Sequence, residues 1–307
     1  MAAALHCVFP GGSLLPMYRS TLRLVLAVII ALVGWQILRA ARSAWFEYGI
    51  FHRPRDIPAM PADAAGLGLQ SVAFRSGDGT QLRGWYIASK TGATVVAVGG
   101  SNATRAAMLP YARILSAGGT GVLLFDWPGC GESEGKIGLG ARERDAVRAA
   151  VAFASERPDV HGGRIGLLGF SVGAHFSLLA AADDPHVRAL VLEGPFGSPW
   201  AQGMAEYRSR GLASQLGGLT GDLFGGMDWT IPDAALAASR ISPRPLLIVA
   251  GARDHSVPAA LSREVFENAR EPKAFWLIEG AEHGEYLTAD PTYAPRLRAF
   301  VERALAQ

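Results

Sequence analysis

Short apolar runs alternate with longer amphipathic stretches through most of the chain. The short runs have the length and β-branched content of buried strands, and the longer stretches have helical periodicity. This order predicts an α/β domain over residues 66–307, with a mostly parallel sheet and helices on both faces. The predicted strands are residues 69–74, 82–88, 93–98, 121–125, 164–168, 187–192, 246–250 and 274–278, and the predicted helices are 106–117, 142–155, 172–182, 259–269 and 293–305.

Two segments depart from this alternation. Residues 49–65 are rich in Pro and Ala without periodicity, which predicts a linker. Residues of about 196–231 contain eight glycines and several aromatic side chains with weak periodicity. This insertion predicts a lid over the carboxyl edge of the sheet, where open α/β sheets bind their ligands.

The N-terminal 48 residues contain one candidate membrane helix. Residues 22–41 are about 20 largely apolar positions, enough to cross a bilayer if the arginines at both ends reach the interface. An uncleaved anchor, a cleaved signal peptide and a buried core helix all fit such a run. We expect the anchor, because the only small-x-small pattern, at 41–43, contains an arginine. Met17 is an alternative start.

The charge and the cysteine content bear on membrane orientation, on nucleic-acid binding, and on disulfides and metal sites. Four arginines follow the apolar run and two accompany its start, which slightly favours a cytoplasmic catalytic domain. The formal net charge is +2 with no block of Lys or Arg, so nucleic acid is not an expected partner. Cys7 and Cys130 lie in different parts of the chain, so we expect no structural disulfide. No Cys or His pair has zinc-ligand spacing, and we expect neither a metal nor another cofactor.

Residues 169–173 read Gly-Phe-Ser-Val-Gly, a G-x-S-x-G motif between a predicted strand and a predicted helix. Such a nucleophile sits on a strained turn, and glycines two residues before and after it remove side chains that would collide with neighbouring elements. The alternative is an ordinary turn in a glycine-rich chain. The strand and helix on either side favour Ser171 as a nucleophile.

Asp254 and His283 each follow a later predicted strand, in the chain order nucleophile, acid, base. His283 would take the proton of Ser171, and Asp254 would orient the imidazole and stabilise its cation. Glu193, at the end of another predicted strand, is an alternative acid. The other histidines weighed as bases are less favourably placed: His161, His175, His186 and His255.

An oxyanion hole needs two N–H donors near the nucleophile. One is expected from Val172, directly after Ser171, and the second from the loop after the first parallel strand. That loop reads Gly-Gly-Ser-Asn at residues 99–102, and Ser101 is the expected donor through its backbone N–H. Glycines here would let the backbone approach the substrate closely.

Four motifs give the chain a resemblance over roughly residues 68–307. They are the G-x-S-x-G motif, G-x-x-D-x-x-V-P at 251–258, Glu-His-Gly at 282–284 and Asp-Trp-Pro-Gly-Cys-Gly-Glu-Ser at 126–133. With them the chain resembles membrane-anchored serine hydrolases of the α/β-hydrolase fold, related to dienelactone-hydrolase and prolyl-oligopeptidase-like hydrolases. In that family the D-x-x-G-x-G-x-S turn shapes the site floor, which implies that Cys130 is not a nucleophile. The chain departs from the family at residues 99–100, where His-Gly is usual.

The resemblance implies hydrolysis of esters, thioesters or amides. We expect an ester or thioester hydrolase acting on a lipophilic acyl substrate near a membrane. A peptidase or amidase is an alternative, and a non-catalytic membrane-anchored binding module is an alternative of another class. The apolar side chains of the insertion either pack it onto the sheet or line an acyl pocket; they are Phe196, Trp200, Met204, Tyr207, Leu212, Leu216, Leu219, Leu223, Phe224, Met227 and Trp229.

Overall fold

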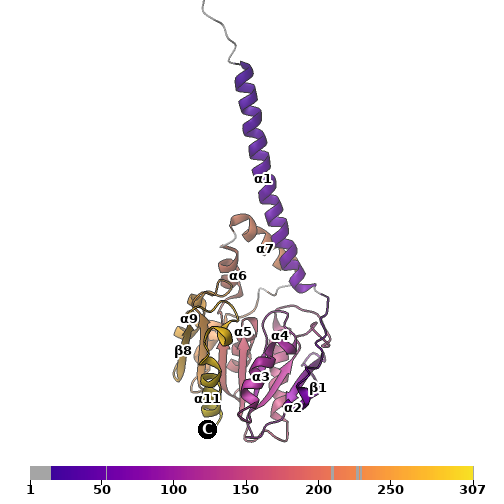
Figure 1. Ribbon diagram of the computed structural model, residues 1–307, viewed down its shortest axis with the longest axis vertical. Coiled ribbons are helices and arrows are strands. Elements are labelled where there is room, and N and C mark those ends of the chain that lie inside the picture. The colour runs from indigo at the N-terminus through magenta and orange to yellow at the C-terminus, as the bar shows by residue number, and fades with distance from the viewer. Residues whose placement is uncertain (1–14, 53, 209–210, 226–227, 229, 307) are drawn as a thin grey trace, which may run out of the picture.

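A sheet of eight strands forms the body of the protein, and one long helix projects from it (Figure 1). The computed structural model describes residues 15–52, 54–208, 211–225, 228 and 230–306, and Met227 and Trp229 of the insertion lie outside these. The strands of the described part are β1 (Leu69–Arg75), β2 (Gln81–Ile87), β3 (Thr94–Val98), β4 (Gly121–Phe125), β5 (Ile165–Phe170), β6 (Val187–Glu193), β7 (Leu246–Gly251) and β8 (Lys273–Ile278).

The strand order is β1-β2-β4-β3-β5-β6-β7-β8. Strand β2 is antiparallel to both of its neighbours, and the strands from β3 to β8 run parallel. The carboxyl ends of the parallel strands therefore meet at one edge, where the predicted site residues follow β5, β7 and β8. The predicted α/β-hydrolase fold class is confirmed.

Helices cover both faces of the sheet and enclose two separate hydrophobic cores. Alternate residues of a strand point to opposite faces: Val96 and Val98 of β3 join one core, and Val95 and Ala97 join the other. The first core is completed by α4 (Ala141–Ser155), α5 (Val172–Asp183), α8 (Ala234–Ala237) and α9 (Ala259–Asn268), and the second by α3 (Leu109–Ser116), α10 (Tyr286–Ala289) and α11 (Tyr293–Leu305).

Most predicted strand and helix bounds lie within two residues of the observed ones, and two differences are larger. The predicted helix 106–117 is a short 3₁₀ turn, η1 (Arg105–Met108), followed by α3. Pro110 occupies the first turn of α3, where its fixed φ and missing N–H favour a helix start. The linker begins later than the predicted residue 49, because the N-terminal helix α1 (Leu15–Phe51) continues through residue 51. A single helical turn, α2 (Ala64–Leu67), then precedes the sheet, and a 3₁₀ turn, η2 (Ala238–Arg240), follows α8.

Helix α1 is long and apolar enough to cross a membrane over Arg19–Phe46, with a mean hydropathy of 2.2 in its most apolar window. None of that window is buried against the rest of the protein, so the buried-core-helix interpretation is wrong. A signal sequence would meet the same criterion.

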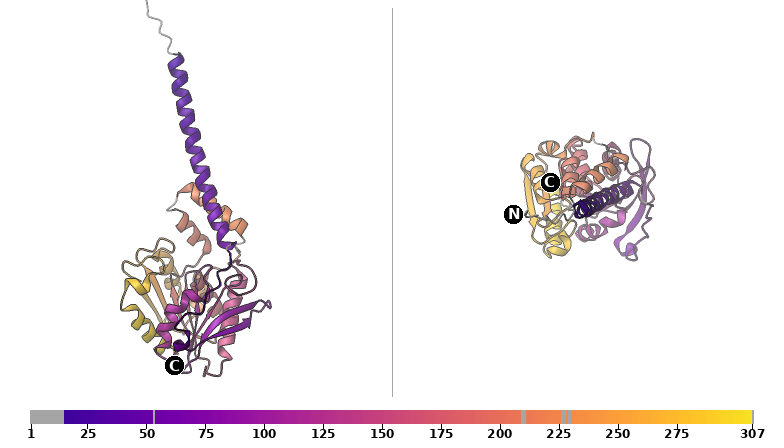
Figure 2. Two further views of the ribbon diagram at one scale, coloured as in Figure 1. Left: turned by 45° about the vertical axis from the view of Figure 1, so that its right-hand side comes forward. Right: turned by 90° about the horizontal axis from the view of Figure 1, so that it is seen from above.

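The insertion after β6 forms two helices, α6 (Pro199–Arg208) and α7 (Leu212–Gly225). Helix α6 rises from the sheet edge, and α7 lies beside the lower part of α1 in each view (Figures 1 and 2). The insertion thus joins the body to the long helix.

Candidate active site

Ser171 lies on a sharp turn between β5 and α5. Its φ of 55° and ψ of −121° are unusual for a residue with a side chain and hold the hydroxyl at the head of the helix. A Cβ on Gly169 would lie 2.5 Å from the Gly173 carbonyl oxygen, and one on Gly173 would lie 2.4 Å from the Val98 carbonyl oxygen. Both glycines of the motif are therefore required by close backbone approach.

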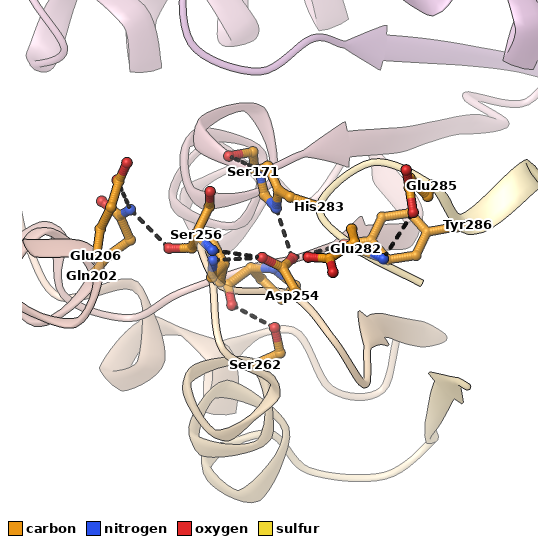
Figure 3. A network of polar contacts seen from close by, with 12 residues as sticks. Ser171, Gln202, Glu206, Asp254, Ser256, Ser262, Glu282, His283, Glu285 and Tyr286 are labelled. Atoms are coloured by element: carbon orange, nitrogen blue, oxygen red, sulfur yellow. Dashed lines mark hydrogen bonds and ion pairs between the residues drawn. The ribbon is translucent and has the colours of Figure 1, made fainter. Parts of the chain in front are cut away.

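Ser171, His283 and Asp254 form one chain of hydrogen bonds (Figure 3). The distance from His283 Nε2 to Ser171 Oγ is 3.0 Å, and the distance from His283 Nδ1 to Asp254 Oδ2 is 2.7 Å. The serine comes from the end of β5, the acid from the loop after β7, and the histidine from the loop after β8. This arrangement lets His283 accept the serine proton while Asp254 fixes the imidazole tautomer.

The carboxylate of Asp254 is held in place by its own loop. Its side chain is fully buried, and its Oδ1 accepts the backbone N–H groups of Ser256 at 2.9 Å and Val257 at 2.8 Å. Its other oxygen, which faces His283, lies 3.5 Å from the hydroxyl of Tyr286. The two backbone bonds leave that second oxygen directed at the imidazole.

The backbone of Glu193 lies beside Ser171, but its carboxylate is bonded to two tyrosines and not to His283. Its carboxylate accepts hydrogen bonds from the hydroxyls of Tyr111 and Tyr293. Burial raises its pKa to about 7. Only its backbone meets the nucleophile, through a 2.8 Å bond from the Ser171 N–H to the Glu193 carbonyl oxygen. The structure does not bring the alternative acid to the base.

The four other candidate histidines are separate from this chain of bonds. His175 is buried in α5, where its Nδ1 lies 3.1 Å from the Phe196 carbonyl oxygen and its ring stacks on the Phe196 ring. Burial lowers the pKa of His175 to about 4, so it stays neutral at physiological pH. His255 is exposed beside the acid, and His186 is exposed and bonded to Asp184; His161 lies in a loop on the other side of the sheet.

The two expected oxyanion donors lie in segments that meet at the nucleophile. Val172 is the first residue of α5. A Cβ on Gly100 would lie 3.5 Å from the Ser171 Cβ and 3.0 Å from the Phe170 ring, so the loop before Ser101 passes close over the nucleophile. Donation by the N–H groups of Ser101 and Val172 stays a prediction.

Trp127 holds this loop and was not singled out by sequence reasoning. Its indole N–H donates to the carbonyl oxygens of Gly99 at 3.1 Å and Gly100 at 2.9 Å. In a planar trans peptide the C=O and N–H point in opposite directions. Fixing the Gly100 carbonyl toward Trp127 therefore directs the Ser101 N–H away from the indole. The signal in the sequence was the aromatic residue within the 126–133 turn.

A buried ion pair ties the same loop to the same turn. Arg105, just after the loop, donates its backbone N–H to Asp126 Oδ1 at 2.7 Å and its guanidinium to Asp126 Oδ2 at 2.6 Å. Asp126 also accepts the N–H of Glu132 at 3.0 Å, and Arg105 forms an ion pair with the Glu132 side chain. The turn thus braces the loop at residues 99–102. Cys130 is buried within the turn.

Helix α6 of the insertion contacts the loop that carries Asp254. Gln202 of α6 donates to the Ser256 carbonyl oxygen at 3.0 Å and to Glu206 at 3.0 Å (Figure 3). Phe196 is buried in the core, whereas Trp200 is largely exposed, as are the leucines at positions 212, 216 and 223. Phe196 therefore packs the insertion, whereas the three leucines do not. The side chains of Tyr207 and Phe224 lie outside the described part.

Within the described residues, no group of three or more His, Cys, Asp or Glu side chains could hold a metal ion. The chemistry that the site can perform is that of a serine activated by a histidine and an aspartate.

The fold and this arrangement define the α/β-hydrolase class. The family described as serine aminopeptidase, S33, matches residues 89–228. The protein YfhR of Escherichia coli K12 is 31% identical over 225 residues, which cover 70% of this chain and 73% of YfhR. The chain therefore belongs to the α/β-hydrolase family.

The chain is also similar to two proteins whose activities are named. The polyketide transferase grgF of a Penicillium species is 27% identical over 74% of this chain and 93% of that protein. The crystal structure of the esterase Pf2001 of Pyrococcus furiosus superposes with a TM-score of 0.70 at 21% identity, covering 81% of this chain and 96% of the esterase. The second likeness establishes the fold alone.

Proposed function

We propose that the protein is a serine hydrolase that cleaves carboxylic ester or thioester bonds through an acyl-enzyme. The observation that carries this proposal is the hydrogen-bonded chain from Asp254 through His283 to Ser171. Ser171 is the nucleophile, His283 the general base and acid, and Asp254 the group that orients the base. Membership in a hydrolase family supports the reaction class.

The reaction proceeds in two halves. Ser171 Oγ attacks the acyl carbon while His283 Nε2 accepts its proton, and the resulting oxyanion is bound by the N–H groups of Val172 and Ser101. His283 returns the proton to the departing alkoxide or thiolate, which leaves an acyl-serine. Water, deprotonated by His283, then attacks this ester, and the carboxylic acid and the free serine are released.

The proposed substrate is a lipophilic acyl ester or thioester reached at a membrane surface. The similarity to a polyketide transferase supports acyl chemistry. Residues of about 22–41 form the membrane anchor, the linker follows the end of α1 and extends to residue 65, and residues 66–307 form the catalytic domain with its lid at about 196–231. The arginines that follow the span favour a cytoplasmic catalytic domain.

Labelling with a fluorophosphonate probe tests the nucleophile. The wild-type protein should be labelled, and Ser171→Ala should remove both the label and turnover, lowering kcat by about 10⁴-fold or more. Ser177→Ala is the matched control, because Ser177 lies on the same helix α5 with a buried hydroxyl that has no hydrogen-bond partner. Labelling that persists in Ser171→Ala would refute the assignment.

A panel of acyl esters, acyl thioesters and peptide amides then separates the reaction classes. Ester and thioester hydrolysis with no amide cleavage is the expected result. Faster cleavage of N-terminal peptide amides would favour the aminopeptidase activity that the family description names. No turnover of any of them, together with no labelling, would favour a binding module.

A further inference from the structure

The small residues of helix α7 are buried against the rest of the protein, and three of its leucines are exposed on the opposite face. The residues at positions 214, 217, 218 and 221 are buried, and all four are serine or glycine. On the opposite face Leu212, Leu216 and Leu223 are 71%, 58% and 64% exposed. A helix on the surface of a soluble domain shows the reverse pattern, with its apolar face toward the core.

The glycine face of α7 packs on the end of α1. A Cβ on Gly217 would lie 2.0 Å from the carbonyl oxygen of Ala40, so the two backbones approach too closely for any side chain. The hydroxyl of Ser43 donates to the Ser214 carbonyl oxygen at 3.0 Å, and this bond is buried. Close packing of small residues, joined by a serine hydrogen bond, is how helices associate within membranes.

A groove of about 640 Å³ runs along this helix pair. Its lining combines apolar and cationic side chains: Trp35, Leu38, Arg39, Arg42, Ser43, Phe46 and Ser214. Arg39 also lies beside the start of α7, where a Cβ on Gly211 would be 3.3 Å from its guanidinium. Apolar surface next to two guanidinium groups matches a phospholipid, whose acyl chains adjoin an anionic headgroup.

The level of this groove follows from the length of the span. Residues 22–41 would cross the hydrocarbon core. The contacts of α7 with Ala40 and Ser43 therefore lie where acyl chains meet headgroups. Helix α7 lies beside the lower part of α1 (Figures 1 and 2), and its exposed leucines therefore adjoin the exposed apolar residues of α1 at that level.

We propose that α7 is embedded in the membrane interface beside α1, and that the groove between them binds an anionic phospholipid of the bilayer. This inference rests on the proposed membrane anchor and is independent of the proposed chemistry. The headgroup contacts Arg39 and Arg42, and the acyl chains contact Trp35, Leu38 and the α7 leucines. The lid of the hydrolase is thereby fixed at the surface that would supply its substrate.

Depth-dependent quenching in vesicles tests the position of α7. The full chain carrying Ser171→Ala and Cys7→Ser is reconstituted with a bimane label on Leu216→Cys, since the remaining Cys130 is buried. Leu236→Cys is the matched control, because Leu236 is 72% exposed on α8 of the catalytic body. Phospholipids with a nitroxide on the acyl chain should quench the label at position 216 and leave the label at 236 bright. Equal emission at both positions overturns the inference.

Carbonate extraction of the same vesicles separates the two proposals. Protein that washes off contradicts the anchor and this inference together. Protein that stays in the membrane while the label at position 216 is unquenched contradicts this inference alone.

Phosphatidylglycerol tests the headgroup contact. Replacing part of the phosphatidylcholine in nanodiscs by phosphatidylglycerol should raise the Tm of the full chain, and the double variant Arg39→Gln/Arg42→Gln should lose this rise. The control is Arg148→Gln/Arg303→Gln, which removes two exposed arginines of the catalytic body and should keep it. A rise that persists in the Arg39→Gln/Arg42→Gln variant, or that is absent from the parent chain, overturns the headgroup contact.

Discussion

Replacing Trp127 by phenylalanine removes one hydrogen-bond donor and keeps an aromatic ring in its place. The indole N–H donates to the carbonyl oxygens of Gly99 and Gly100 in the loop after β3, at 3.1 Å and 2.9 Å. Trp127 is only 4% exposed, so water cannot readily replace the lost donor. Leaving a buried acceptor unsatisfied costs about 1–3 kcal/mol.

If Ser101 is the oxyanion donor proposed above, that free energy should appear in the rate, because the loop can then rotate its peptides away from the orientation that the indole holds. A loss of about 1–3 kcal/mol corresponds to a decrease in kcat of roughly 5- to 150-fold. The upper end of this range reaches only the lower end of the factor of about 10²–10³ that follows complete removal of one oxyanion donor. KM should change little, since these donors act mainly in the transition state.

Steady-state hydrolysis of p-nitrophenyl acetate by Trp127→Phe measures both quantities, with thermal unfolding recorded on the same samples. Trp276→Phe is the control: it removes an indole from the edge strand β8, where Trp276 contacts Tyr293 with ring centres 6.0 Å apart. The control should keep its kcat. A wild-type kcat in Trp127→Phe, or an equal decrease in both variants, refutes the role of Trp127 as a positioning residue.

Three further predictions concern Glu193, Gly217 and the acyl substrate. Burial raises the pKa of Glu193 from 4.5 to about 7, so protonation of Glu193 favours the folded state. The stability that this group contributes is complete below pH 4.5 and is lost as the pH rises through about 7. Glu193→Gln should therefore flatten this part of the curve of Tm against pH, and parallel curves for the variant and the wild type would contradict the assignment. Gly217→Ala should destabilise the contact of α7 with α1 by about 1–3 kcal/mol, because the added Cβ overpacks it. The measurement is Tm, and the control is Gly66→Ala, whose added Cβ contacts no other atom within 4 Å. Equal Tm values for the two variants would exclude the close contact. A buried methylene contributes about 0.8 kcal/mol, so kcat/KM for p-nitrophenyl esters should rise a few-fold per carbon from acetate toward decanoate, and a steady decline would exclude an acyl pocket.

The fold could be predicted because most strands are short runs of apolar residues. The parallel strands β3 to β7 are buried on both faces, so β4 reads as the continuous run Gly-Val-Leu-Leu-Phe and its bounds were predicted without error. The three residues chosen for the site meet because parallel strands bring their carboxyl ends to one edge. Chain order alone did not separate Asp254 from Glu193, whose strands are neighbours; the separation depends on Tyr111 and Tyr293, which are distant in the sequence and hold Glu193.

Trp127 and α7 could not be predicted, for different physical reasons. The role of Trp127 depends on a contact between loops that follow two adjacent strands, and no local pattern encodes such a contact. The helical character of α7 was hidden by its glycines, which lower helix propensity and remove the apolar residues expected on the packed face.

The same glycines become consistent with a helix once the solvent around α7 is considered. Sequence periodicity identifies helices by assuming that apolar side chains point inward, which holds only where the outside is water. Beside a membrane helix the inward face requires small residues and the outward face tolerates leucine, which is the pattern of residues 212–223. A glycine-rich insertion in a chain with an apolar N-terminal helix should therefore be examined for leucines at helical spacing opposite the glycines, before it is assigned as irregular.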